Sequence, residues 1–210
     1  MRESTKILVG LIALFLLCGA TYFLVRNNEL KATPQSPAPT TYTNTEYGYS
    51  FSHDAALTLI EFTPEYVTLE DQGAVEPNEV VQVAVENADI SESFESAEEY
   101  ARTRALVFCA ADGPTASMRC TRTTRTEPFT TATGIVGEVF YLEFVETRGE
   151  EVTTREAGPF YAFNVSMDTP GSGYSVLIFR PARFHEESAE YDRGAQATFD
   201  VVNTLKVFAR

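Results

Sequence analysis

The longest hydrophobic feature of the chain is an uninterrupted apolar run at residues 7–25. The run carries no charge, and Lys6 and Arg26 flank it. As a helix it would be roughly 28 Å long, close to the thickness of the hydrocarbon core of a bilayer. It therefore predicts a transmembrane anchor, with residues 1–6 in the cytoplasm. A cleavable signal has a shorter apolar core, so we expect the anchor to be retained. Cleavage of the segment and lipidation at Cys18 are the alternatives.

Residues 26–41 are polar and include three prolines within the stretch ATPQSPAPTT. Such a stretch is extended and semi-rigid, and it predicts a tether that holds the rest of the chain roughly 30 Å from the membrane. Lysine and arginine are balanced on the two sides of the anchor, so they do not decide its orientation. The tether and a plausible cysteine pair suit an exported domain at 42–210. We therefore expect a single-pass protein of the cytoplasmic membrane with its C-terminal domain outside.

Short apolar–polar alternations fill most of residues 42–210, and this is the period of half-buried strands. They predict strands at 47–51, 57–62, 66–69, 79–86, 119–126, 137–147, 152–156, 160–167, 174–179 and 205–208. Turn residues separate the later strands, which indicates an antiparallel meander.

Two helices are predicted between these strands. The first begins at Ser96-Ala97-Glu98-Glu99, which is a capping box. The second spans about 187–203, with one apolar side made of Tyr191, Ala195, Phe199 and Val202. The expected fold class is therefore α+β, a mostly antiparallel sheet with two helices.

Two segments at the ends of the domain carry a family resemblance. Residues 42–51 read YTNTEYGYSF and residues 199–208 read FDVVNTLKVF, with Glu98-Glu99-Tyr100-Ala101 and the strand at 134–143 between them. In this order they resemble exported, membrane-anchored bacterial proteins of the PsbP-like fold, a group of unknown function. The resemblance implies an α/β/α sandwich used for binding or assembly, and it transfers no catalytic residues.

The charge is unevenly distributed around a net value of −14. Residues 32–101 hold fourteen acids and no lysine or arginine, whereas residues 102–125 hold five arginines and one acid. So acidic a domain argues against nucleic acid and anionic lipid headgroups as partners. The arginines either neutralise the acidic half within the fold, or form a docking patch for a protein partner at Arg119, Arg122 and Arg125.

Cys109 and Cys120 bracket a ten-residue loop that contains the turn signal Asp112-Gly113-Pro114. In an oxidising compartment they are expected to form a disulfide, which would stabilise the fold by about 3 kcal/mol in the chain-entropy model. Free thiols are the alternative. A metal site is disfavoured because two cysteines without neighbouring histidines do not complete a tetrahedral shell.

Residues suited to catalysis are scarce. His53 and His185 are the only histidines, and the alternation of a strand points His53 away from Ser52 and Asp54. An acid pair such as Glu61 with Glu143 is the remaining enzyme hypothesis. We expect no enzyme, no cofactor and no metal. The leading hypothesis is a noncatalytic, membrane-tethered extracytoplasmic interaction module of unknown process. The alternative is an extracytoplasmic domain that binds a small ligand or a cation.

Overall fold

The computed structural model describes residues 38–73, 78–87, 96–105, 118–148, 150–165, 175–183 and 189–208. The predicted anchor at 7–25 and most of the predicted tether lie outside these residues. Within the described ranges no helix is long and apolar enough to cross a membrane. The anchor therefore stays a prediction. The compact unit that contains the domain begins at Ala38, slightly before the predicted start at residue 42.

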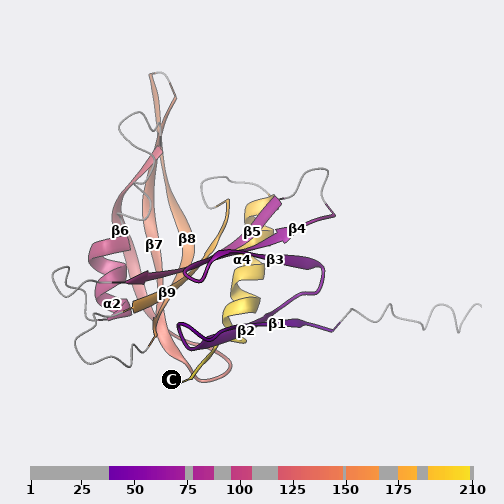
Figure 1. Ribbon diagram of the computed structural model, residues 1–210. Helices are drawn as coiled ribbons and strands as arrows, with labels where there is room; N and C mark the ends of the chain where they lie inside the picture. The colour runs from indigo at the N-terminus through magenta and orange to yellow at the C-terminus, as the bar shows by residue number, and fades with distance from the viewer. Residues whose placement is uncertain are drawn as a thin grey trace, which may run out of the picture. The chain divides into compact units, whose positions relative to one another are not determined.

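Two antiparallel sheets form this unit (Figure 1). The three-stranded sheet has the order β1-β2-β10, with β1 at Thr40–Asn44, β2 at Tyr49–His53 and β10 at Lys206–Val207. The two ends of the domain meet here, because Lys206 pairs with Ser50 and Val207 with Tyr49. The segments that carry the family resemblance are thus neighbours in space.

The seven-stranded sheet has the order β3-β4-β5-β9-β8-β7-β6. Its strands are β3 Leu57–Thr63, β4 Tyr66–Asp71, β5 Asn78–Asn87, β6 Met118–Thr130, β7 Val136–Arg148, β8 Glu151–Val165 and β9 Ser175–Pro181. The polar segment at 119–126, predicted as a strand, belongs to β6, which is an edge strand of this sheet. One prediction was wrong: 152–156 and 160–167 are not two strands, because β8 runs through both.

The cause of that error is the pair Gly158-Pro159 inside β8. Phe140 of β7 pairs with Phe160 and Leu142 pairs with Ala157, so β8 has one extra residue opposite Tyr141. Gly158 has φ +130, a conformation in which a side chain at this position would meet the ring of Tyr141. A β-bulge absorbs the glycine and the proline, and the ladder continues on both sides of it.

The first helix starts at the predicted capping box. The Ser96 hydroxyl oxygen accepts a hydrogen bond from the Glu99 amide over 3.1 Å. Helix α2 (Ala97–Glu99) then continues into a π-helical segment, η1 (Tyr100–Arg104). Ala97, Tyr100 and Ala101 are buried, so this side of the helix faces the core.

The second helix, α4 (Ala189–Val202), buries a side that shares only Val202 with the predicted one. Its buried residues are Gly194, Thr198, Val201 and Val202, whereas Phe199 is 43% exposed. At Gly194 an added Cβ would lie 3.0 Å from the backbone oxygen of Val80. The small residues allow α4 to pack close to the sheet. This close packing is favoured over burial of the larger side chains on the predicted side of the helix.

The two helices cover opposite faces of the seven-stranded sheet. Tyr161 and Phe163 of β8 belong to a first core cluster with Val201 and Val202 of α4. Phe160 and Ala162 belong to a second core cluster that includes Ala97 and Tyr100. Because successive side chains of a strand point to opposite faces, β8 is buried on both sides there. The α+β class with a mostly antiparallel sheet and two helices is confirmed.

Candidate functional site

The three arginines of the predicted partner patch lie in a row on β6. In a regular strand Arg119 and Arg122 would point to opposite faces, since they are three residues apart. In β6, however, Arg119 pairs with Val145, Arg122 with Glu143 and Arg125 with Tyr141. These partners are spaced by two on β7 and therefore share one face. The structure thus brings Arg119, Arg122 and Arg125, called here the arginine row, to the same face.

Two bulges produce this alignment. The register of β6 against β7 shifts between Cys120 and Arg122, and again between Thr123 and Arg125. Thr121 and Thr124 are the extra residues, and both are exposed. Every third residue then points inward: Cys120, Thr123 and Thr126 pair with the buried Phe144, Leu142 and Phe140. The direction of the side chains in β6 therefore repeats every three residues, and each repeat places one arginine on the outward face.

Acidic residues neutralise two members of the row. Arg122 Nη2 lies 2.8 Å from Glu143 Oε2, and Arg125 lies 3.4 Å from both Glu127 and Glu156. Threonine hydroxyls support the same carboxylates, because Thr121 donates to Glu143 over 2.6 Å and Thr124 donates to Glu156 over 2.6 Å. In the described part of the chain Arg119 takes part in no ion pair.

These contacts act on the protonation of Glu143. The hydrogen bonds from Arg122 and then Thr121 lower the pKa of the Glu143 carboxyl, and Glu143 in turn raises the pKa of Arg122. Both groups are therefore charged over a wide pH range. They are also open to solvent, so the pair contributes little to stability.

An aromatic group adjoins the row on the same face. The guanidinium carbon of Arg125 lies 3.6 Å from the centroid of the Tyr141 ring. This is the geometry of a cation–π contact. Both proposed roles of the arginines have a basis here, since Arg122 and Arg125 pair internally, while Arg119 and the stacked Arg125–Tyr141 pair are presented to solvent.

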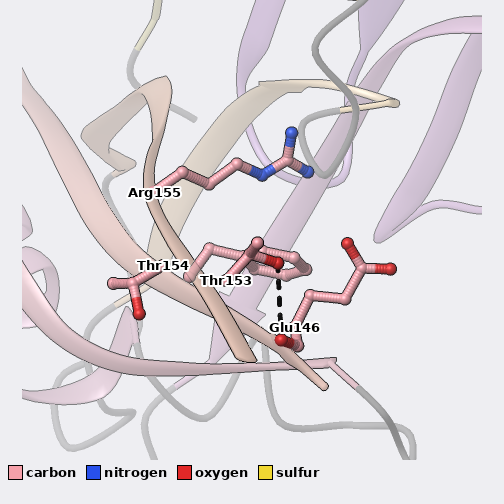
Figure 2. Close-up of a pocket in the computed structure, with 5 residues that line it drawn as sticks. Glu146, Thr153, Thr154 and Arg155 are labelled. Atoms are coloured by element: carbon pink, nitrogen blue, oxygen red, sulfur yellow. Dashed lines mark hydrogen bonds between the residues drawn. The ribbon is translucent and has the colours of Figure 1, made fainter. Parts of the chain in front are cut away.

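A cavity of about 260 Å³ lies toward the far ends of β7 and β8. It is lined by Phe144, Glu146, Thr153, Thr154 and Arg155. Four of these form two cross-strand pairs on the same face of the sheet, Phe144 with Arg155 and Glu146 with Thr153. Figure 2 shows the guanidinium of Arg155 and the carboxylate of Glu146 extending in the same direction, away from Thr154. The sequence analysis did not identify this cavity.

Arg155 is the cationic group of the cavity. Its guanidinium lies over the Phe144 ring, 5.2 Å from the centroid. Among the described residues its Nη2 atom is buried and has no hydrogen-bond partner. A buried donor without a partner is costly and marks a place where a ligand atom or water can bind.

The predicted disulfide stays a prediction. Cys109 lies outside the described residues, while Cys120 is 9% exposed and belongs to the second core cluster. Asn164, part of a glycosylation sequon in the sequence, accepts a hydrogen bond from the Ala97 amide over 2.7 Å and so holds the start of α2. Among the described residues no group of three or more His, Cys, Asp or Glu is arranged to hold a metal ion.

The residues considered for catalysis lie apart. The His53 Nδ1 atom is 2.9 Å from the backbone oxygen of Asp54, and the Ser52 hydroxyl bonds Thr41. Four strands separate β3, which carries Glu61, from β7, which carries Glu143. At about 4.8 Å per strand the two carboxylates are roughly 24 Å apart, too far for a glycosidase pair.

Comparison with known proteins gives structural neighbours only. No family model matches the chain, and no curated protein matches it. The chain is similar to the solution structure of cyanobacterial PsbP (CyanoP) from Synechocystis sp. PCC 6803, with 13% identity and a TM-score of 0.49, over 84% of this chain and 96% of that one. It is also similar to a crystal structure from Bacteroides thetaiotaomicron VPI-5482, with 9% identity and a TM-score of 0.32, over 84% of this chain and 50% of that one. Because both TM-scores are below 0.5, the fold class stated above rests on this chain's own sheets and helices.

Proposed function

We propose that the protein is a noncatalytic interaction module of PsbP-like fold, tethered outside the cytoplasmic membrane by the apolar run at 7–25. The module's contact surface is the face of β6 and β7 that carries the arginine row and Tyr141. The observation that supports this function most is the pair of bulges that turns Arg119, Arg122 and Arg125 to one side. β-Bulges are over-represented at sheet edges and next to active sites, where they re-aim side chains.

The composition of this face fits a polypeptide partner. Arginine and tyrosine are among the residues enriched at protein interfaces, because each offers a large flat surface together with hydrogen-bond donors. Arg119 takes part in no ion pair within the described residues, so it is available to a carboxylate of the partner. The stacked Arg125–Tyr141 pair offers a preformed flat contact beside it. The partner is therefore expected to present an acidic side chain and an apolar or aromatic surface.

In-cell crosslinking of the full-length protein, followed by mass spectrometry, tests this function. A photoreactive residue in place of the exposed Thr121 reports on what touches the row. We expect one recurrent polypeptide in the crosslinks, lost when Arg119, Arg122 and Arg125 are all changed to Glu. The control changes the same charge at exposed positions elsewhere, namely Arg102→Glu, Arg183→Glu and Lys206→Glu. A partner that survives the row variant, or crosslinks to this chain alone, would refute the proposal.

The membrane anchor is tested separately. We expect the full-length protein to stay in the membrane after carbonate washing, and its domain to be digested by a protease added outside the cytoplasmic membrane. A variant that begins after residue 31 should be lost from the membrane fraction. Recovery of the full-length chain in the soluble fraction would contradict the tether.

A second candidate function, the binding of a small ligand, is favoured by a different observation. The cavity between β7 and β8 holds a buried guanidinium nitrogen without a protein partner among the described residues. This cavity belongs to the face opposite to the arginine row, since Arg155 pairs with Phe144 of the second core cluster. The two functions can therefore be tested independently.

A further inference from the structure

Strand β7 carries apolar side chains on both of its faces, but the two faces are covered unequally. Phe140, Leu142 and Phe144 are at most 3% exposed and belong to the second core cluster, on which α2 packs. Tyr141 and Val145 point to the other face and are only half-buried. A strand that is apolar on both faces is typical of a sheet that is covered on both sides. The open face of β7 thus has the composition of a surface that is normally covered.

Helix α4 covers a different part of this face. Val139 pairs with Tyr161 of the first core cluster, so α4 and the arginine row are on the same side of the sheet. The contacts of α4 with this sheet are mainly with β5 and β9. Val152 of β8 pairs with Thr147, shares the same face and is 61% exposed. The apolar residues that α4 leaves open, called here the open strip, are Tyr141, Val145 and Val152.

We propose that the open strip and the arginine row together bind an amphipathic helix of the partner polypeptide. The apolar side of that helix lies on the open strip, and its acidic side chains point toward β6, where Arg119 is available to a carboxylate. The partner helix then lies beside α4 and extends the helical layer over β6 and β7. This inference rests on the proposed interaction module and specifies the kind of segment that its partner presents.

The shape of the surface favours a helix over an added strand. A strand that joins an edge needs regularly spaced backbone groups, and the two bulges at Thr121 and Thr124 interrupt that spacing along β6. From β6 across β7 to β8 the surface is about 10 Å wide, since neighbouring strands are about 4.8 Å apart. This width matches the diameter of about 10–12 Å of a helix with its side chains.

In-cell photocrosslinking of the full-length protein distinguishes a helix from an extended segment. p-Benzoyl-phenylalanine replaces Tyr141 in one strain and the exposed Thr147 in another. These positions are six residues apart on one face, so they are roughly 20 Å apart. We expect both probes to trap the polypeptide that a probe at Thr121 traps, at two sites about 14 residues apart in its sequence, because a helix rises 1.5 Å per residue. An extended segment would span this distance with about six residues.

Variants test the apolar contact. We expect Val145→Ser combined with Val152→Ser to lower the yield of the crosslink from Thr121 at least about fivefold. Val136→Ser is the matched control, because Val136 belongs to the same strand, is 68% exposed and shares the opposite face with Phe140. Its yield should equal that of the parent protein. If thermal unfolding shows that the double variant does not fold, Val152→Ser alone serves, and its yield should fall at least about twofold.

Three results would overturn the inference and leave the interaction module standing. In the first, Thr121 traps a polypeptide but the probes at positions 141 and 147 do not. In the second, the two trapped sites are about six residues apart. In the third, the folded serine variants crosslink as well as the Val136→Ser control. If no polypeptide other than this chain is trapped at any of the three positions, the inference and the proposed function fail together.

Discussion

At the scale of single residues, Gly137 of β7 has no room for a side chain. A Cβ added there would overlap the backbone oxygen of Ala162 and the ring of Phe163. Backbone and a buried ring have little freedom to move, so Gly137→Ala must displace β8 or repack the first core cluster. We predict a loss of about 1–3 kcal/mol in the free energy of unfolding, measured by urea denaturation.

Gly73→Ala is the comparison for that prediction. The nearest atom to an added Cβ there is Oδ1 of the Asp71 side chain, at 3.2 Å, and the position is exposed at the end of β4. Its unfolding free energy should change by no more than about 0.5 kcal/mol. Equal unfolding midpoints for the two variants would mean that β7 and β8 are less closely packed at Gly137 than described.

At the scale of elements, the bulges of β6 predict opposite tolerances for two adjacent threonines. Thr123 points inward and donates a hydrogen bond over 2.7 Å to the backbone oxygen of Ala101, a buried residue of η1. Thr124 is a bulge residue, exposed beside Glu156. Thr123→Lys leaves the oxygen without its donor and should cost at least about 1 kcal/mol. Thr124→Lys places a cation next to a carboxylate and should change stability by no more than about 0.5 kcal/mol. Thermal unfolding of both variants checks this, and the reverse order of stabilities would contradict the period-three reading of the strand.

Strand β6 and its neighbourhood show which features the sequence can predict and which it cannot. The alternation of Phe140, Leu142 and Phe144 in β7 and the capping box at Ser96 were read correctly, because each is a local pattern with a local cause. The bulges of β6 have no such local cause, since they depend on register against β7. The spacing of Arg119, Arg122 and Arg125 was visible, but a period of three fits neither a regular strand nor a helix, and the sequence alone did not assign these side chains to a face.

The second helix illustrates a different limit. Hydrophobicity favoured the side with Tyr191 and Phe199, whereas the packed side carries Gly194 and Thr198. A helix that packs closely on a sheet needs small residues at the contact, and the sequence alone does not show which side of the helix the sheet will contact. The cavity at Arg155 was missed for a related reason, because Phe144, Glu146, Thr153 and Arg155 come from two strands and gather only through their pairing.

At the scale of the whole molecule, carboxylates hold separate elements together, and their protonation links stability to pH. Arg193 of α4 pairs with Asp71 at the end of β4, and this hydrogen bond is the main cause that lowers the pKa of Asp71. Tyr47 donates a hydrogen bond to Glu65 over 2.9 Å and lowers the pKa of that carboxyl. In each case the pKa in the folded protein lies below its value in the unfolded chain.

The direction of the pH effect follows from these shifts. A carboxyl with a lowered pKa contributes stability above its unfolded value, near pH 4, and loses that contribution as the pH falls through the folded value. Glu138 acts in the opposite sense, because burial, and then the nearby Glu98, raises its pKa. Relief of the repulsion behind a net charge of −14 also favours the folded state on mild acidification. Total stability is therefore a sum of opposing terms, and single variants are needed to separate them.

Asp71→Asn isolates the contact between α4 and β4. We predict that this variant is less stable than the parent protein at pH 7, and that the difference shrinks as the pH falls below about 4, because the parent then loses the same charge. Urea unfolding at several pH values between 7 and 3 measures it, with Glu151→Gln, an exposed carboxyl at the start of β8, as the control for removing one negative charge. A difference that stays constant down to pH 3 would show that Asp71 contributes through its shape rather than its charge, and α4 would then depend on its small-residue packing alone.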